Sequence, residues 1–307
     1  YPELTAESLQ NAIANRHALN SDQIICGTGS DEILIFTVLT FCSPGDEVIH
    51  SQHGFEMYPI ITKYAGAESI LASEIDYKIS IKSIIDNISD STKIIFIANP
   101  NNPTSTYLNH DELRLLMSKI PNNIVVVIDT AYAEFVDAKD YDKTFSLADE
   151  YNNIIITRTF SKAYSLAGLR LGWGYASKLL INIIKKLRPP FNLPPGAIAA
   201  GIAALNDKDH LEKVVCYNSN IKSWFIDELN NLGFKAYDTQ ANFVFVIIPD
   251  NKNQNASLIN DHLLSKGIAV RYLLSYGLKN ALRITLGTKE ELNKTIEILK
   301  EFIRNHD

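Results

Sequence analysis

The sequence has few cysteines, no long apolar run and no cluster of basic residues. The three cysteines, Cys26, Cys42 and Cys216, are odd in number and widely spaced, which argues against a disulfide framework and favours a reducing, cytoplasmic environment. The apolar runs, such as residues 124–128 and 243–248, have the length of strands, and none approaches the length of a membrane span. We therefore expect a cytoplasmic protein without membrane segments.

The charged residues exclude further classes of partner. The formal net charge is −6 and no tract of Lys or Arg is present, so we expect no nucleic-acid partner. His50 and His53 are the only closely spaced histidines, and no third ligand stands near them, so we interpret them as ordinary loop residues and expect no metal site. The hydrophobic fraction of 46% over 307 residues is typical of a globular chain with one large domain or two.

Apolar segments of strand length alternate with helical patterns through the first two thirds of the chain. Because these strands are apolar throughout, we expect both faces of their sheet to be covered by helices, as in a mostly parallel α/β sheet. Four prolines within residues 189–195 interrupt the pattern. The sequence predicts a large domain, residues 1–205, and a smaller C-terminal α/β domain, residues 206–307.

The expected strands are residues 24–26, 47–50, 93–98, 124–129, 154–158, 171–175, 234–237, 242–248, 268–270 and 282–285. The expected helices are residues 31–41, 55–64, 109–118, 196–205, 209–232 and 289–303.

A glycine-rich turn, residues 27–32 (G-T-G-S-D-E), stands between a predicted strand and a predicted helix. Such turns bind phosphate through free backbone N–H groups and the helix dipole. The dinucleotide-binding pattern is disfavoured because Glu32 replaces its third glycine, and no Gly-Lys-Ser/Thr follows. Two interpretations stay open: a cup for one phosphate, or a helix start capped by Ser30, with Asp31 and Glu32 favouring the dipole.

Two other polar clusters follow buried strands. Residues 99–104, N-P-N-N-P-T, form a stiff turn that presents side-chain amides. Asp129 ends the most apolar strand, where a carboxylate is costly unless a cation, such as a protonated ring nitrogen, pairs with it. Tyr132 could donate a hydrogen bond to an oxygen of the same ring. The alternatives are an ordinary turn and an aspartate that caps the turn after it.

The segment 159–170, T-F-S-K-A-Y-S-L-A-G-L-R, follows the strand at 154–158. A lysine in a dry, apolar setting loses its charge more readily, which suits Lys162 to act as a nucleophile that forms a Schiff base. Ser161 and Arg170 are the residue types that a nearby phosphate needs. The alternative is a surface Ser-Lys pair and a solvent-directed arginine. Because ligands of such sheets bind beyond the carboxyl ends of the strands, we expect one shared site.

Together these motifs resemble the pyridoxal-phosphate aminotransferases of the aspartate-aminotransferase superfamily. The segments N-P-N-N-P-T, D-x-A-Y-x-E-F and S-K-A-Y-S-L-A-G-L-R-L-G carry a resemblance that covers residues 1–303. Within the superfamily the pattern is most similar to the class II histidinol-phosphate aminotransferase family, and L-R-I-T-L-G-T at 282–288 adds to the likeness. The resemblance implies fold type I of the pyridoxal-phosphate-dependent transferases, with a seven-stranded sheet in the large domain, and a homodimer.

The resemblance also implies a role for each candidate residue. Lys162 would form a Schiff base with pyridoxal 5'-phosphate and move the substrate proton, while Asp129 would keep the ring nitrogen protonated. Asn102 and Tyr132 would bind the phenolic oxygen. The remaining cofactor-binding residues would be Phe55 (stacked on the ring), Ser30, Asp31, Glu32, Thr159, Ser161 and Arg170, with Tyr1 reaching the phosphate of the partner subunit. The substrate residues would be Arg283 for the carboxylate, Arg271 for the distal phosphate, and Asn242 nearby.

The implied reaction is transamination between histidinol phosphate and 2-oxoglutarate, or from glutamate to imidazole-acetol phosphate in the biosynthetic direction. An aromatic amino-acid aminotransferase and a threonine-phosphate decarboxylase, which use the same cofactor, stay open as alternatives. A non-catalytic regulator with this fold is disfavoured because Lys162, Asp129, Tyr132 and Arg170 are all present.

Several positions depart from the family pattern. Phe55 stands where the family usually has tyrosine, Ser105 where it has glycine, and Thr130 where it has glutamate. These positions bear on local geometry and not on the reaction. The family also has an arm of several tens of residues before the position of Tyr1. We therefore expect either a longer gene product or an incomplete site.

Overall fold

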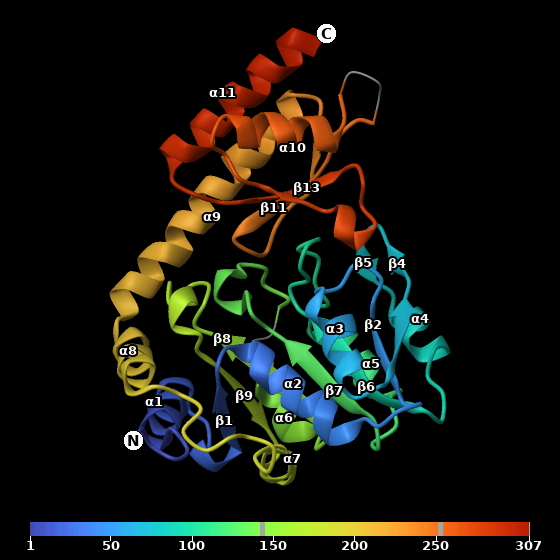
Figure 1. The fold of residues 1–307 in the computed structure, drawn as a ribbon, viewed down its shortest axis with the longest axis vertical. Coiled ribbons are helices and arrows are strands. Elements are labelled where there is room, and N and C mark those ends of the chain that lie inside the picture. The colour runs from blue at the N-terminus through green and yellow to red at the C-terminus, as the bar shows by residue number, and fades with distance from the viewer. Residues whose placement is uncertain (142–144, 251–253, 307) are drawn as a thin grey trace.

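The computed structural model describes residues 1–141, 145–250 and 254–306. Its larger part contains a seven-stranded sheet in the order β1-β9-β8-β7-β6-β2-β3 (Figure 1). Strand β9 runs antiparallel to both of its neighbours, and the other adjacent strands pair in parallel. This arrangement confirms the predicted α/β fold with a mostly parallel sheet.

The strands of this sheet are β1 (Ile24–Gly27), β2 (Glu47–Ser51), β3 (Glu68–Ala72), β6 (Thr92–Ala98), β7 (Val125–Asp129), β8 (Ile154–Thr159) and β9 (Gly172–Ala176). A small hairpin is formed by β4 (Glu74–Ile75) and β5 (Lys78–Ile79). The α-helices of this part are α1 (Glu7–His17), α2 (Ser30–Phe41), α3 (Met57–Tyr64), α4 (Ile81–Asp86), α5 (His110–Met117), α6 (Phe145–Glu150), α7 (Lys178–Ile184) and α8 (Pro195–Asn206). Short 3-10 turns are η1 (Ser21–Gln23), η2 (Ala133–Phe135) and η3 (Ala167–Leu169).

Each face of the large sheet has its own hydrophobic core. Val126 and Ile128 of β7 belong to a core that includes side chains of α1, α5, α6 and α8. Val125 and Val127 of the same strand belong to a second core, together with side chains of α2, α3 and α7. Alternate residues of one strand therefore serve opposite faces, which explains why the strand is apolar throughout.

The last third of the chain forms an antiparallel four-stranded sheet in the order β10-β11-β13-β12. Its elements are α9 (Lys208–Asn231), β10 (Lys235–Ala236), β11 (Phe243–Ile247), α10 (Ala256–Ser265), β12 (Arg271–Tyr272), η4 (Leu274–Tyr276), β13 (Ala281–Thr285) and α11 (Lys289–His306). Helix α9 runs from one part to the other (Figure 1). Its Val214 packs with Tyr132 of the large part, and its Phe225 lies in the core of the small part. The boundary between residues 205 and 206 stays a prediction.

The structure corrects several local expectations. Strand β3, the β4–β5 hairpin and helices α1, α4, α6, α7 and α10 lie outside the predicted ranges. The strand expected at 268–270 is wrong, because the short edge strand β12 is Arg271–Tyr272. His50 lies in β2 and not in a loop. Ser30 is the first residue of α2 and not its cap: the N-cap is Gly29, with φ 85° and no side-chain capping bond.

In the described ranges, no helix is long and apolar enough to cross a membrane. The same ranges contain no group of three or more His, Cys, Asp or Glu side chains that could hold a metal ion.

Candidate active site

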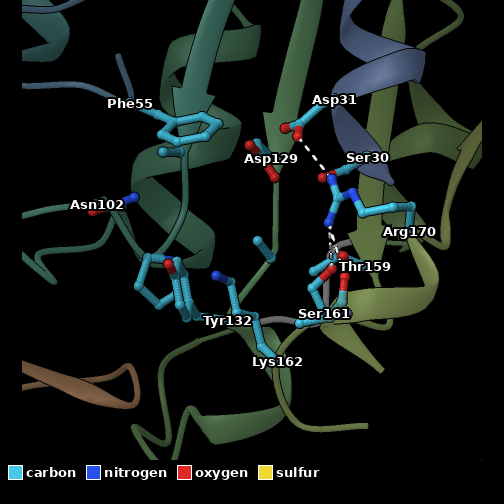
Figure 2. Close-up of a pocket in the computed structure, with 14 residues that line it drawn as sticks. Ser30, Asp31, Phe55, Asn102, Asp129, Tyr132, Thr159, Ser161, Lys162 and Arg170 are labelled. Atoms are coloured by element: carbon cyan, nitrogen blue, oxygen red, sulfur yellow. Dashed lines mark hydrogen bonds and ion pairs between the residues drawn. The ribbon is translucent and has the colours of Figure 1, made fainter. Parts of the chain in front are cut away.

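A cavity lies beyond the carboxyl ends of β1, β6, β7 and β8 (Figure 2). The predicted cofactor residues that line it are Ser30, Asp31, Phe55, Asn102, Asp129, Tyr132, Thr159, Ser161, Lys162 and Arg170, joined by Ala98, Pro100, Ala131 and Ala167. The phosphate turn, the asparagine turn, the Asp129 loop and the lysine segment thus meet at one place. They meet because parallel strands end at the same edge of their sheet.

Asp129 lines the cavity and lies between Phe55 on one side and Arg170 on the other in the view of Figure 2. Its side chain is buried, and it accepts hydrogen bonds from two hydroxyl groups and from the Ala131 backbone N–H. Tyr58 donates to Oδ2 and Thr157 donates to Oδ1, each at 3.1 Å. Burial, with a smaller contribution from Asp31, raises the pKa of the Asp129 carboxyl to about 6, although both hydroxyls act in the opposite direction.

Lys162 and Tyr132 stand together at another side of the cavity. The Lys162 Nζ atom lies 5.4 Å from the centroid of the Tyr132 ring. Burial, reinforced by the positive charge of Arg283, lowers the pKa of Lys162, so its amine loses a proton more readily than that of an exposed lysine. Burial raises the pKa of the Tyr132 phenol, which therefore stays protonated and can donate a hydrogen bond.

The start of α2 forms the opposite end of the cavity. Arg170 Nη2 lies 3.2 Å from Oδ2 of Asp31, and Arg170 Nη1 lies 3.5 Å from Oγ of Ser161. The N-terminus of α2 has no side-chain cap, so its first N–H groups are available to bind an anion beside the Arg170 guanidinium. A Cβ on Gly172 would lie 2.2 Å from the backbone N of Ser30, so only glycine lets β9 approach the turn this closely.

A buried ion pair joins the two loops that carry Tyr132 and Lys162. Arg158 Nη1 lies 2.9 Å from Oε1 of Glu134, and the two side chains are 3% and 10% exposed. Glu134 belongs to η2, directly after Tyr132, and Arg158 immediately precedes Thr159 at the end of β8. The pair therefore fixes the spacing between these loops.

Five predicted site residues do not line this cavity, and they are Tyr1, Glu32, Asn242, Arg271 and Arg283. The Glu32 carboxylate accepts hydrogen bonds of 2.7 Å from the Thr28 backbone N–H and from the Asn192 amide. Tyr1 is exposed, and its ring centroid lies 5.2 Å from that of Phe191.

The three substrate candidates all belong to the small part of the molecule. Arg283 in β13 donates from Nη1 to Oδ1 of Asn102, so it reaches the edge of the cavity. Arg271 in β12 forms an ion pair with Glu56, with 2.7 Å between Nη2 and Oε2. Asn242 lies just before β11, where its carbonyl accepts the backbone N–H of Leu286 at 2.8 Å. The structure thus places both arginines next to residues that flank the cavity.

Tyr58, Thr157 and Glu56 were not expected from the sequence to act at the site. Tyr58 stands three positions after Phe55, in the first turn of α3. Thr157 precedes Thr159 by two positions in β8, so both point to the same face of the sheet. Only these spacings in the sequence could have indicated Tyr58 and Thr157 as site residues. To use them, one must already know which side of α3 and which face of the sheet border the cavity.

The whole chain is similar to known aminotransferases. Residues 1–299 match the family model for aminotransferase class I and II. The chain is 39% identical over 304 residues to histidinol-phosphate aminotransferase from Maricaulis maris, covering 99% of this chain and 84% of that protein. It is 41% identical over 303 residues to the protein of the same name from Paramagnetospirillum magneticum, again covering 99% and 84%.

Solved structures show the same fold. The structure of histidinol-phosphate aminotransferase from Sinorhizobium meliloti in complex with pyridoxal-5'-phosphate has a TM-score of 0.92 and 26% identity, covering 99% of this chain and 83% of that one. The chain belongs to the class I and II aminotransferases, which depend on pyridoxal phosphate. Within that class it is a member of the histidinol-phosphate aminotransferase family.

The donor set of the cavity fits pyridoxal 5'-phosphate. Asp129 offers a buried carboxylate whose hydrogen-bond donors are all uncharged, and a protonated ring nitrogen would supply a positive charge beside it. The uncapped start of α2 beside Arg170 suits a phosphate. Lys162 lines the same cavity, below Asp129 in the view of Figure 2.

Proposed function

We propose that this protein transfers an amino group between histidinol phosphate and 2-oxoglutarate. In the biosynthetic direction, glutamate and imidazole-acetol phosphate would give histidinol phosphate, a step in histidine biosynthesis. The observation that carries the proposal is the convergence of Lys162 and Asp129 in one cavity, with pKa shifts that suit an amine nucleophile and a partner for a ring cation. Identity of about 40% to relatives named for this activity supports the choice of substrate.

Asp129, Lys162 and Tyr132 each have a separate role in the proposed reaction. When bound, pyridoxal phosphate supplies an electron sink that makes the proton on the amine-bearing carbon acidic. Asp129 keeps the ring nitrogen protonated, because a carboxylate in a buried site is strongly stabilised by a cation beside it. Lys162 takes a proton from the amine-bearing carbon of the first substrate. When the reaction runs in reverse on the second substrate, it returns a proton to the corresponding carbon. The lowered pKa of Lys162 allows both transfers. Tyr132, held protonated by burial, donates a hydrogen bond to the phenolic oxygen.

The other predicted residues orient the cofactor and the substrate. Phe55 covers the ring, and Asn102 assists Tyr132 at the phenolic oxygen. The phosphate is bound by Ser30, Asp31, Glu32 (through the start of α2), Thr159, Ser161 and Arg170, and by Tyr1 of a second copy. Two arginines from the small part, Arg271 and Arg283, receive either the substrate phosphate or the carboxylate of glutamate, and Asn242 lies near the substrate.

We also propose that the protein is a cytoplasmic homodimer. The assignment of Tyr1 requires a second subunit, since Tyr1 lies beside Phe191 and does not line the cavity of its own chain. The free thiols of Cys26, Cys42 and Cys216 are consistent with a reducing compartment. Sedimentation of the purified protein would measure the assembly directly.

Visible absorbance of the purified protein with pyridoxal phosphate tests the reaction. We expect a bound-cofactor band that changes on addition of histidinol phosphate more readily than on addition of phenylalanine or threonine phosphate. The Lys162→Ala variant should lose both this band and turnover. A band that is the same in Lys162→Ala, or a preference for phenylalanine or threonine phosphate, would contradict the proposal.

A further inference from the structure

Arg271 and Arg283 are direct neighbours across the β12–β13 pair. Residues opposite each other on antiparallel strands direct their side chains to the same face. Here both guanidinium groups contact the large part of the molecule, Arg283 at Asn102 and Arg271 at Glu56. The two arginines therefore form one positively charged surface at the edge of the cofactor cavity.

Glu56 is the acidic partner of this surface. It is the N-cap residue of α3 and directly follows Phe55, which lines the cavity. Its Oε2 atom lies 2.7 Å from Nη2 of Arg271, and the side chains are 31% and 50% exposed, respectively. Solvent thus reaches the ion pair, so Arg271 is accessible to a small anion.

The charges around Glu56 are not balanced. Burial raises the pKa of the Tyr276 phenol in η4; the charge of Glu56 raises it further and the charge of Arg283 lowers it. Arg271 pairs with the Glu56 carboxylate, whereas Arg283 contacts the uncharged side chain of Asn102. A substrate that brings its own anionic end needs the donors of Arg271 that Glu56 uses.

We propose that Glu56 is a specificity-determining residue that competes with the anionic end of the substrate for Arg271. This inference rests on the proposed function, which places the phosphate end of one substrate at Arg271. In the free site, Glu56 holds Arg271 and neutralises one of the two positive charges. An arriving phosphate monoester exchanges one charged hydrogen bond to Arg271 for another, whereas an uncharged ligand has no means of displacing Glu56. The ion pair thus lowers the affinity for ligands whose anionic end must bind Arg271, and it leaves the affinity for ligands without an anionic end unchanged.

The size of this penalty follows from the exposure of the pair. Exposed ion pairs contribute little, so removing the competing charge should tighten binding of a phosphate monoester by about two- to fivefold. A positioning role for Glu56 predicts the opposite sign, since an arginine without its partner would lose its orientation and bind the phosphate more weakly. The sign of the change therefore separates the two roles.

Calorimetry on the cofactor-loaded protein measures this sign without turnover. The probe is imidazolylpropyl phosphate, which has no amine and cannot react, and the reference ligand is imidazolylpropanol, which lacks the phosphate. The variant is Glu56→Gln. The matched control is Glu301→Gln, which removes the same charge from another exposed pair, with Lys266 at 2.9 Å, in helix α11.

We expect Glu56→Gln to bind the phosphate probe more tightly and the alcohol unchanged, while Glu301→Gln alters neither. In an Arg271→Ala background, Glu56→Gln should have no further effect. Unchanged or weaker binding of the phosphate by Glu56→Gln overturns the inference while the proposed function stands. If the wild-type protein neither binds the phosphate probe nor turns over histidinol phosphate, the proposed function fails and takes the inference with it.

Discussion

The two ends of the cofactor cavity are built on different physical principles. At the end that we assign to the cofactor ring, Asp129 is 6% exposed, and its hydrogen-bond donors, the hydroxyls of Tyr58 and Thr157 and the Ala131 backbone N–H, are uncharged. At the end that we assign to the phosphate, the side chains of Arg170 and Asp31 are 50% and 34% exposed and form an ion pair. Burial makes the single carboxylate respond strongly to protons and cations. The exposed end depends instead on backbone geometry, because water and salt screen its charges.

Replacement of the buried carboxylate gives the largest expected effect. Asp129→Asn removes the charge that keeps the ring nitrogen protonated, and we expect kcat to fall by about 10²–10³-fold, the range for loss of one preorganised electrostatic contact. Steady-state kinetics with histidinol phosphate measures the loss. Conversely, Asp31→Asn at the exposed end should reduce kcat far less. Equal losses in the two variants would contradict the contrast between the ends.

The same buried group should make the cofactor-free protein less stable as the pH rises. The pKa of Asp129 is raised from 3.8 to about 6 in the folded state, so the folded state binds the proton more tightly than the unfolded state. Its contribution to the free energy of unfolding therefore falls as pH rises from about 4 to about 6, by roughly 3 kcal/mol at most. Denaturation of cofactor-free Asp129→Asn at pH 4 and pH 8 tests this. The variant should match the wild type at pH 4 and be the more stable of the two at pH 8.

The phosphate end should be sensitive to backbone space. Gly172→Ala places a Cβ 2.2 Å from the backbone N of Ser30, and we expect a loss of about 1–3 kcal/mol in stability together with weaker cofactor binding. Gly168→Ala in the same motif is the control, because its Cβ meets no atom within 4 Å. Thermal melts and cofactor titrations measure both effects. A Gly172→Ala protein that behaves like Gly168→Ala would show that the turn can move aside.

Tyr58→Phe tests the hydroxyl partners of Asp129 and should have a smaller effect. Loss of the Tyr58 donor removes one of the contacts that lower the pKa of Asp129, so that pKa should rise further, by on the order of one unit. The difference in stability of the cofactor-free protein between pH 4 and pH 8 should then widen. Thr157→Val removes the donor to the other oxygen and should act in the same direction. A narrower difference in both variants would show that these hydroxyls do not hold the ionised carboxylate.

The smallest expected effect belongs to the exposed ion pair. Asp31→Asn should change the free energy of unfolding by no more than about 1 kcal/mol, and the change should disappear at high salt. Denaturation at low and high ionic strength measures it. A salt-independent loss of several kcal/mol would mean that the phosphate end depends on charge as strongly as the ring end does.

Much of the site followed from residue order along the chain. Asp129 and Lys162 each stand at the end of an apolar strand, and parallel strands bring such ends together. The family resemblance then supplied the roles of Asn102, Tyr132 and Arg170. The phosphate turn was less certain, since both a helix cap and a phosphate cup suited Ser30. In the structure α2 begins at Ser30 and its N-cap is Gly29, so Ser30 is not the cap, and the phosphate cup stays a proposal.

Local sequence patterns do not predict the contacts between elements that are far apart in the chain. The strand predicted at 268–270 was misplaced because β12 is a two-residue edge strand whose position is set by pairing with β13. Tyr58 reaches Asp129 only because α3 packs on the sheet at that point, and Glu56 meets Arg271 only because the small part lies against the large one.

The sequence by itself determined the mostly parallel sheet and the chemical groups at its edge, because both follow from local hydrophobic patterns and strand ends. Only the tertiary structure decided the environment of those groups. A carboxylate at position 129 becomes proton-sensitive through burial by distant segments, and Gly172 fits the phosphate turn through the close approach of β9 to the start of α2. Burial, close packing and charge pairing depend on distances between segments far apart in the chain, and no local pattern specifies those distances.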